Sequence, residues 1–90
     1  MKRYVYSATG TWNVVHESDT DSGKATCWAL EINHEKYGKY VWITGVLDDD
    51  EETIVQYNVE VIPYDDVITL CECKSLASAK RWVSMWLERI

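Results

Sequence analysis

The sequence contains no phenylalanine, one proline and four glycines, and no apolar run long enough to span a membrane as a helix. None of the glycines belongs to a phosphate-binding motif, and neither His16 nor His34 stands in a pattern that would activate a nucleophile. Repeats, linkers and low-complexity segments are also absent. We therefore expect one domain over residues 1–90 that is not an enzyme and needs no cofactor.

Basic residues are scarce relative to acidic ones. The chain has nine lysines and arginines and fifteen aspartates and glutamates, which gives a net charge of −6. The negative electrostatic field of such a chain repels nucleic acid and anionic membranes and attracts basic protein surfaces. The odd number of cysteines, three, and the lack of an N-terminal apolar signal segment favour a cytoplasmic protein with reduced thiols.

Five tryptophans and six tyrosines make up the whole aromatic content apart from the two histidines. These rings carry polar groups and are common at protein interfaces, so some of them could form a binding surface. The alternative is that they fill the core of a domain poor in leucine.

The centre of the sequence predicts a β-hairpin. Two runs rich in β-branched and aromatic residues, 40–47 and 53–62, flank five consecutive acids at 48–52. In the second run Val55, Tyr57, Val59 and Val61 alternate with polar residues, which is the period of a strand with one wet face. Further strands are expected at residues 2–8, 12–16, 25–33 and 67–73. Whether the first two of these form a hairpin or one bent edge strand stays open.

The C-terminal segment changes to a helical period. Apolar residues recur at spacings of three and four, and Ser75 is placed to cap the first turn; the apolar positions are Leu76, Ala79, Val83, Trp86 and Ile90. A helix of about fifteen residues is expected to cover the apolar face of the sheet. The predicted fold is α+β: an antiparallel sheet of four to six strands with one C-terminal α-helix packed on one face.

Two metal-like patterns fail on spacing. Cys71 and Cys73 are separated by one residue, closer than the usual pair of zinc ligands, so that Cys27 and these two are better explained as small buried side chains. Residues 17–23 resemble a calcium loop, but Trp28 stands where the bidentate acid is required. We expect no metal site.

Acidic residues dominate the stretch from 48 to 66, which has no base; its acids are Asp48, Asp49, Asp50, Glu51, Glu52, Glu60, Asp65 and Asp66. If the 48–52 loop and the turn after Pro63 lie on one side, they form a negative surface for a basic partner. The alternative is a solvated loop whose charges keep the hairpin tip from aggregating. Exposed aromatics such as Tyr64 or Trp42 could anchor such a partner.

The predicted helix is the basic part of the chain and carries two tryptophans; these residues are Lys74, Lys80, Arg81, Trp82, Trp86 and Arg89. Bases with interleaved tryptophans suit nucleic acid, because tryptophan stacks on bases. The acidic net charge argues against that function, so the tryptophans are expected to point at the sheet while the cations stay in water.

The ending of the chain, residues 74–82 (KSLASAKRW), resembles the final helix of many short phage reading frames. The general plan of a small acidic sheet closed by one helix resembles the inhibitor proteins of phages and mobile elements, above all the anti-CRISPR proteins, and also small immunity proteins. The resemblance implies a mode of action: occupation of a basic nucleic-acid channel, or another working surface, of a larger complex. If the protein is encoded by a phage, its place would be the host cytoplasm.

The function expected from the sequence is binding and inhibition of a larger, nucleic-acid-binding host complex, such as a CRISPR effector, without direct contact with nucleic acid or membrane. The expected partner-binding residues are Asp48, Asp49, Asp50, Glu51, Glu52, Tyr64, Asp65 and Asp66. One alternative is an immunity protein or antitoxin that neutralises a toxin. Another is a phage structural or assembly protein, which would self-associate through an exposed edge strand. A homodimer is left open.

Overall fold

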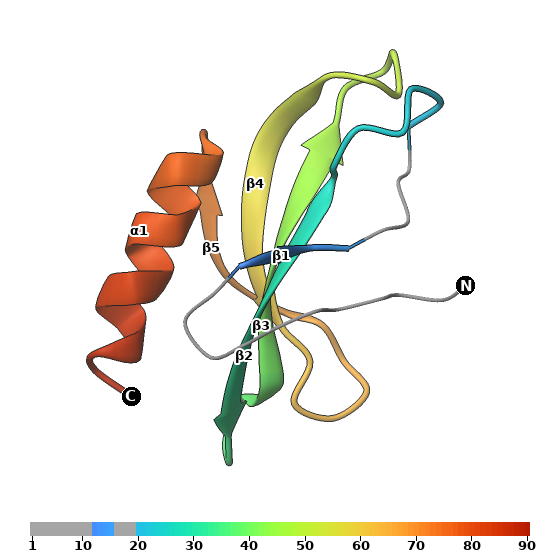
Figure 1. Cartoon of the computed structure of the whole chain (residues 1–90). Helices are drawn as coiled ribbons and strands as arrows, with labels where there is room; N and C mark the ends of the chain where they lie inside the picture. Colours follow the sequence, from blue (N-terminus) through green and yellow to red (C-terminus); the bar gives the residue numbers. More distant parts are fainter. Residues whose placement is uncertain (1–11, 16–19) are drawn as a thin grey trace.

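The structure, a computed structural model, describes residues 12–15 and 20–90. In these residues it contains β1 (Asn13–Val14), β2 (Cys27–His34), β3 (Gly38–Leu47), β4 (Ile54–Val61), β5 (Ile68–Cys73) and α1 (Leu76–Leu87). The strands form one antiparallel sheet in the order β1-β2-β3-β4-β5, and α1 packs against one face of it (Figure 1). The predicted α+β fold is confirmed. The strand expected at residues 2–8 lies outside the described residues.

The predicted hairpin of β3 and β4 is the centre of the sheet. Ile43 of β3 pairs with Trp28 on one side and with Val59 on the other. Near the hairpin tip the pairing of Val46 with Gln56 is followed by that of Leu47 with Ile54, so Val55 is an extra residue on β4. This bulge reverses the expected alternation.

The bulge explains one wrong prediction. Val55 was expected to point inward with Tyr57, but it is 51% exposed. Ile54 takes the inward place instead, where it packs against the core and fills the space beside Gly45.

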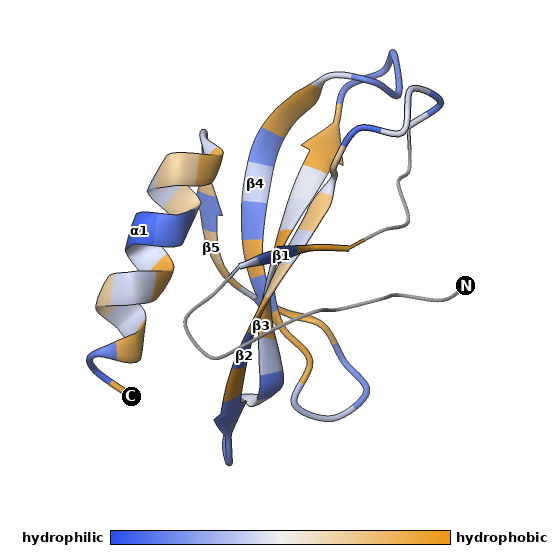
Figure 2. Ribbon diagram, viewed as in Figure 1, coloured by the Kyte–Doolittle hydropathy of each residue, from blue (hydrophilic) through white to orange (hydrophobic). Residues whose placement is uncertain are grey.

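The main core lies between the sheet and α1. Along β4 the hydrophobic and hydrophilic residues alternate, as the bands in Figure 2 show. The helix-facing side chains of the two central strands are fully buried: Val41, Ile43, Val59 and Val61. Ala79 and Val83 of α1 are buried against them. Burial of each valine or isoleucine stabilises the fold by roughly 1.5–3 kcal/mol.

The opposite face of the sheet has a smaller apolar cluster. Val15, Cys27 and Ala29 are buried there, and Trp42 packs against them. Beside this cluster the Thr44 hydroxyl donates a hydrogen bond of 2.8 Å to Glu60 Oε1. We call this side the open face, since α1 lies on the other side of the sheet (Figure 1).

The helix begins as predicted but ends early. Ser75 is the N-cap, and its Oγ accepts a hydrogen bond of 3.1 Å from the backbone N–H of Ser78. The helix spans 12 residues and ends at Leu87, so the expected contribution of Ile90 to its apolar face is wrong, and Ile90 is exposed. No helix among residues 12–15 and 20–90 has the length and apolar character needed to cross a membrane.

β5 is an edge strand of the sheet, in the place where the sequence predicts a strand at residues 67–73. Its first apolar residues are not covered, since Val67 and Ile68 are 56% and 46% exposed. Thr69 pairs with Glu60, while Cys71 pairs with Val59, so that a bulge falls at residue 70.

Candidate functional site

The five consecutive acids, residues 48–52, form the connection from β3 to β4 and are called the acidic tip from here on. Two backbone hydrogen bonds close the turn: Asp48 N–H donates to the Thr53 carbonyl at 2.8 Å, and Glu51 N–H donates to the Asp48 carbonyl at 2.9 Å. Glu51 has a φ of 59°, in the left-handed region that few residues other than glycine adopt. The turn is therefore defined by its own backbone.

Asp50 holds this turn from inside. Its Oδ1 accepts hydrogen bonds of 2.9 Å from the backbone N–H groups of both Glu52 and Thr53, and its Oδ2 accepts one of 2.6 Å from the Thr53 hydroxyl. The Thr53 hydroxyl, followed by the two backbone donors, lowers the pKa of Asp50 to about 2. Asp50 is thus a structural carboxylate of the tip.

Glu52 joins the acidic tip to the loop at residues 20–24. Its Oε1 accepts hydrogen bonds from the backbone N–H groups of Asp21 (2.9 Å) and Ser22 (3.3 Å), and its Oε2 accepts one of 2.8 Å from the Ser22 hydroxyl. The Ser22 hydroxyl is the main reason that the pKa of Glu52 is lowered. Glu52 therefore fixes one loop against another that lies 30 residues earlier in the chain.

Asp49 and Glu51 are left as the outward carboxylates. Both are exposed, and within residues 12–15 and 20–90 no hydrogen bond or ion pair holds either side chain. The sequence presented five equivalent acids, whereas the structure assigns Asp50 and Glu52 to the architecture of the loop. The charges that a partner could contact with least rearrangement are those of Asp49 and Glu51.

Because the Asp50 carboxylate accepts these hydrogen bonds, we expect the fold to lose stability in acid. Its pKa is about 2 in the folded chain, below its ordinary value, so its stabilisation is present above about pH 4 and is lost as the pH falls toward 2. We expect Asp50→Asn to lower the melting temperature at pH 7 and to flatten its decline between pH 4 and pH 2, as measured by circular dichroism.

Asp49→Asn is the matched control for this experiment, because it removes the same charge from the same loop without breaking a side-chain hydrogen bond within the described chain. It should leave the acid decline close to that of the wild type. An Asp50→Asn variant whose decline equals that of the wild type would show that the Asp50 hydrogen bonds do not stabilise the fold.

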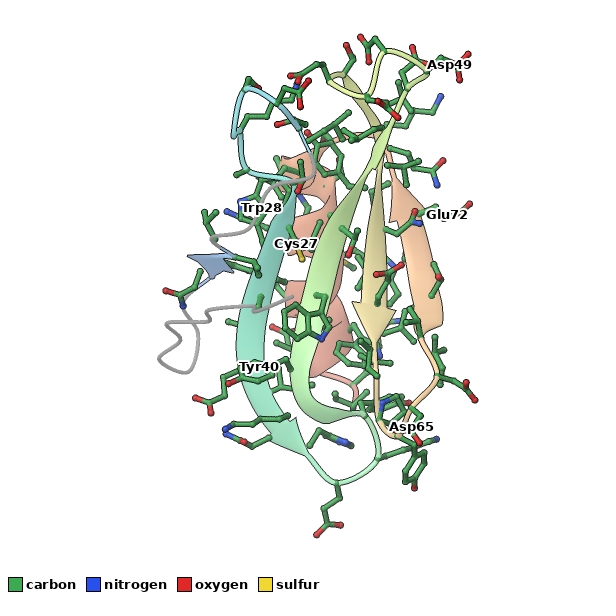
Figure 3. All side chains as sticks on the ribbon, turned by 90° about the vertical axis from the view of Figure 1, so that its right-hand side faces the viewer. Cys27, Trp28, Tyr40, Asp49, Asp65 and Glu72 are labelled. Atoms are coloured by element: carbon green, nitrogen blue, oxygen red, sulfur yellow. The ribbon has the colours of Figure 1, made fainter. Side chains whose placement is uncertain are left out.

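The other predicted site residues, Tyr64, Asp65 and Asp66, lie at the opposite end of the sheet. They belong to the connection between β4 and β5, and Figure 3 shows Asp49 at one end of the molecule and Asp65 at the other. β4 has 8 residues, so at roughly 3.3 Å per residue the two connections are about 25 Å apart. All three side chains are exposed, and Tyr64 is 85% exposed. The structure thus does not join the two acidic groups into one surface.

Trp42, the second aromatic anchor considered from the sequence, is half-buried on the open face. It packs against the buried cluster of Val15, Cys27 and Ala29, and its ring centroid lies 5.4 Å from that of Tyr40. Lys39 Nζ lies 5.5 Å from the Tyr40 ring centroid. Trp42 is therefore committed to the fold to a greater extent than Tyr64.

A second surface lies at the end of α1, where Trp82, Trp86 and Arg89 were considered from the sequence for nucleic-acid binding but a hollow was not predicted. Trp82, Met85, Trp86 and Arg89 line a hollow of about 100 Å³. They are spaced by three and four residues, so they share one flank of the helix. We call these four residues the helix hollow.

An aromatic row supports the helix hollow from the side of the β2–β3 turn. The centroids of the Trp82 and Trp86 rings are 6.0 Å apart with an interplanar angle of 18°, and Tyr37 meets Trp86 edge-on at 5.0 Å. The two tryptophans were expected to point at the sheet. Both do pack against the core, but they are half-buried and also line the hollow.

No family model, curated protein or solved structure matches the chain. Two surfaces of the molecule are suited to binding a partner: the acidic tip at one end of the sheet and the helix hollow near the other.

The three cysteines do not converge. Cys27 lies in the cluster on the open face, whereas Cys71 and Cys73 of β5 pack against the core under α1. The Sγ atoms of Cys71 and Cys73 are 3.7 Å apart, and burial followed by the neighbouring thiol raises the pKa of Cys73. In the part of the chain that the structure describes, no three His, Cys, Asp or Glu side chains are grouped to hold a metal ion.

Proposed function

We propose that the protein is a small stoichiometric inhibitor that binds a basic surface of a larger nucleic-acid-binding protein or complex through its acidic tip. The observation that carries this proposal is the exposure of Asp49 and Glu51 on a turn held in place by Asp50 and Glu52. A turn that is already ordered loses less conformational entropy on binding than a flexible acidic segment.

Electrostatics explains how such a tip would compete with nucleic acid. A channel that binds phosphates is lined by lysine and arginine, and exposed carboxylates satisfy the same cations. The net charge of −6 steers the chain toward such a channel and away from nucleic acid itself. Binding of this kind weakens as salt screens the charges.

The partner proposed first is an effector complex of a nuclease-based defence system, in the manner of an anti-CRISPR protein. The alternative partner is a toxin, which would make the chain an immunity protein or antitoxin. Both use the same acidic surface, so the identity of the captured protein distinguishes them.

The proposal is tested by capturing partners with tagged protein from cells that carry a nuclease-based defence system, at low and at high salt. The double variant Asp49→Asn/Glu51→Gln should bind the captured complex roughly tenfold more weakly at low salt, because it removes two exposed charges. Wild-type binding should itself fall at high salt. Titration of the purified complex by calorimetry measures both effects.

Asp65→Asn/Asp66→Asn is the matched control, since it removes the same charge from the opposite end of the sheet. It should bind like the wild type if the acidic tip is the site. Equal weakening in both double variants would mean that net charge alone drives binding, and unchanged binding in both would remove the acidic tip from the interface.

The helix hollow supports a second candidate, a protein interface that is apolar and insensitive to salt. Tryptophan and arginine dominate the binding energy of many interfaces, and here Trp82, Trp86 and Arg89 surround one hollow beside the exposed Met85. A complex retained at high salt but lost in Met85→Glu would favour this surface over the acidic tip.

A further inference from the structure

Among the residues that the structure describes, the outer edge of β5 is the longest open edge of the sheet. β5 pairs with β4 on one side, and no strand among the described residues pairs with it on the other. Within residues 12–15 and 20–90, the backbone hydrogen bonds outside regular elements do not involve β5 either. At the opposite edge of the sheet, β1 has only two residues. An unpaired edge of six residues is a template for another strand.

This edge has few of the features that normally prevent pairing. Proteins protect edge strands with lysine, proline, inward-pointing charges or β-bulges, and β5 has one bulge, at residue 70. From Val67 to Cys71 the strand has no charged residue, and Val67 and Ile68 are more than 40% exposed. Glu72 is the one charge on β5.

We propose that β5 pairs antiparallel with β5 of a second copy of the chain to form a two-fold symmetric dimer. The register places Ile68 opposite Cys73, Thr69 opposite Glu72, and Leu70 opposite Cys71. A strand of six residues paired in this way adds about four backbone hydrogen bonds, because only alternate pairs exchange them and the bulge at residue 70 lies at the centre of the register. Because the same edge is used by both copies, the assembly closes at two.

The faces of the strand agree with this register. Ile68, Cys71 and Cys73 pair with Val61, Val59 and Tyr57, so they belong to the helix side of the sheet. Thr69 and Glu72 pair with Glu60 and Asn58, so they belong to the open face.

Each residue is therefore matched with one on its own side of the joined sheet. The acid of each copy meets a threonine hydroxyl of the other copy, which can donate a hydrogen bond, and the two Glu72 side chains avoid each other.

The position of α1 leaves the edge accessible. The helix packs over β3, β4 and β5 on one face, and β5 remains the outermost strand when the open face is viewed (Figure 3). In the dimer both helices would lie on the same side of a continuous sheet. The two acidic tips would lie at opposite ends of the dimer. The proposed dimer therefore does not depend on what the tips bind.

The register is tested with two substitutions at one position. Thr69→Glu places two acids opposite each other at two symmetric points and should weaken the dimer roughly tenfold. Thr69→Lys places a cation opposite Glu72 and should keep the wild-type dissociation constant or lower it. Sedimentation velocity over a concentration series, in the presence of a reductant that excludes intermolecular disulfides, measures the constants.

Val55→Glu and Val55→Lys are the matched controls, because they make the same charge changes at an exposed position on β4. Both should dimerise like the wild type. Since Thr69 also lies beside Glu60 in its own sheet, circular dichroism checks folding, and Thr69→Glu/Glu72→Lys should restore the dimer with reversed charges.

A wild-type chain that stays monomeric up to about 0.5 mM would overturn the proposal. This outcome covers the possibility that the β5 edge binds a strand of a different protein instead of a second copy. Equal effects of glutamate and lysine at position 69 would also overturn the register.

Discussion

Replacement of Ile43 by alanine is expected to lower the free energy of unfolding by about 3–4 kcal/mol, a large share of the roughly 5–13 kcal/mol available to a domain of this size. Ile43 is fully buried on the central strand β3, between Trp28 and Val59, and belongs to the core under α1. The truncation removes buried methyl groups and leaves a cavity that the paired strands on both sides cannot close. Chemical denaturation at neutral pH measures the loss.

Val55→Ala is the control for this variant. Val55 is also a β-branched residue in the central hairpin, but it sits on the bulge of β4 and is half exposed. We expect its truncation to cost less than about 0.5 kcal/mol. Losses of similar size in the two variants would contradict the placement of the core and of the bulge.

Gly38→Ala is expected to destabilise the chain by about 2–3 kcal/mol for two separate reasons. Gly38 starts β3 with a φ of 99°, which L side chains rarely adopt. A Cβ atom at this position would also lie 3.3 Å from the Ile62 carbonyl oxygen and 3.3 Å from the Pro63 Cα atom. Both neighbours are backbone atoms, so the contact cannot be relieved by rotation of a side chain.

Gly23→Ala separates the two causes. Gly23 has a φ of 75°, but a Cβ there would meet no atom within 4 Å. Its substitution should therefore cost only the conformational strain, about 1 kcal/mol. If the two variants lost the same stability in thermal unfolding, the close approach of the β2–β3 turn to the β4–β5 connection would have no energetic weight.

The sequence predicted the elements of the sheet and the helix because they depend on local periodicity. Alternation located β2 and β4, and β-branched and aromatic composition located β3 and β5. The change to a spacing of three and four located α1 with its cap at Ser75. The prediction from alternation was wrong at Val55, because a bulge is a property of two paired strands and cannot be recognised in the sequence of either strand alone. The prediction from the helical spacing was wrong at Ile90, because the helix ends before the last apolar residue of that spacing.

The candidate site was predictable as charge but not as structure. The five acids are plain in the sequence, yet the assignment of Glu52 to the Ser22 loop depends on a contact across 30 residues. The separation of Asp49 from Asp65 could have been derived, because successive hairpin connections lie at opposite ends of the strand that they share. The helix hollow depends on how Trp82 and Trp86 divide their rings between the core and the surface, which spacing alone does not determine.

The order of the strands in the sheet, which follows the order of the chain from β1 to β5, has a consequence for the kinetics of folding. The strands β2 to β5 are joined only by the short connections 35–37, 48–53 and 62–67, so each pairing closes a small loop and costs little chain entropy. Such a topology keeps contacting residues near each other in the sequence, which favours fast folding. We expect the sheet to assemble by successive hairpin closure, with α1 able to dock as soon as β3, β4 and β5 are in place.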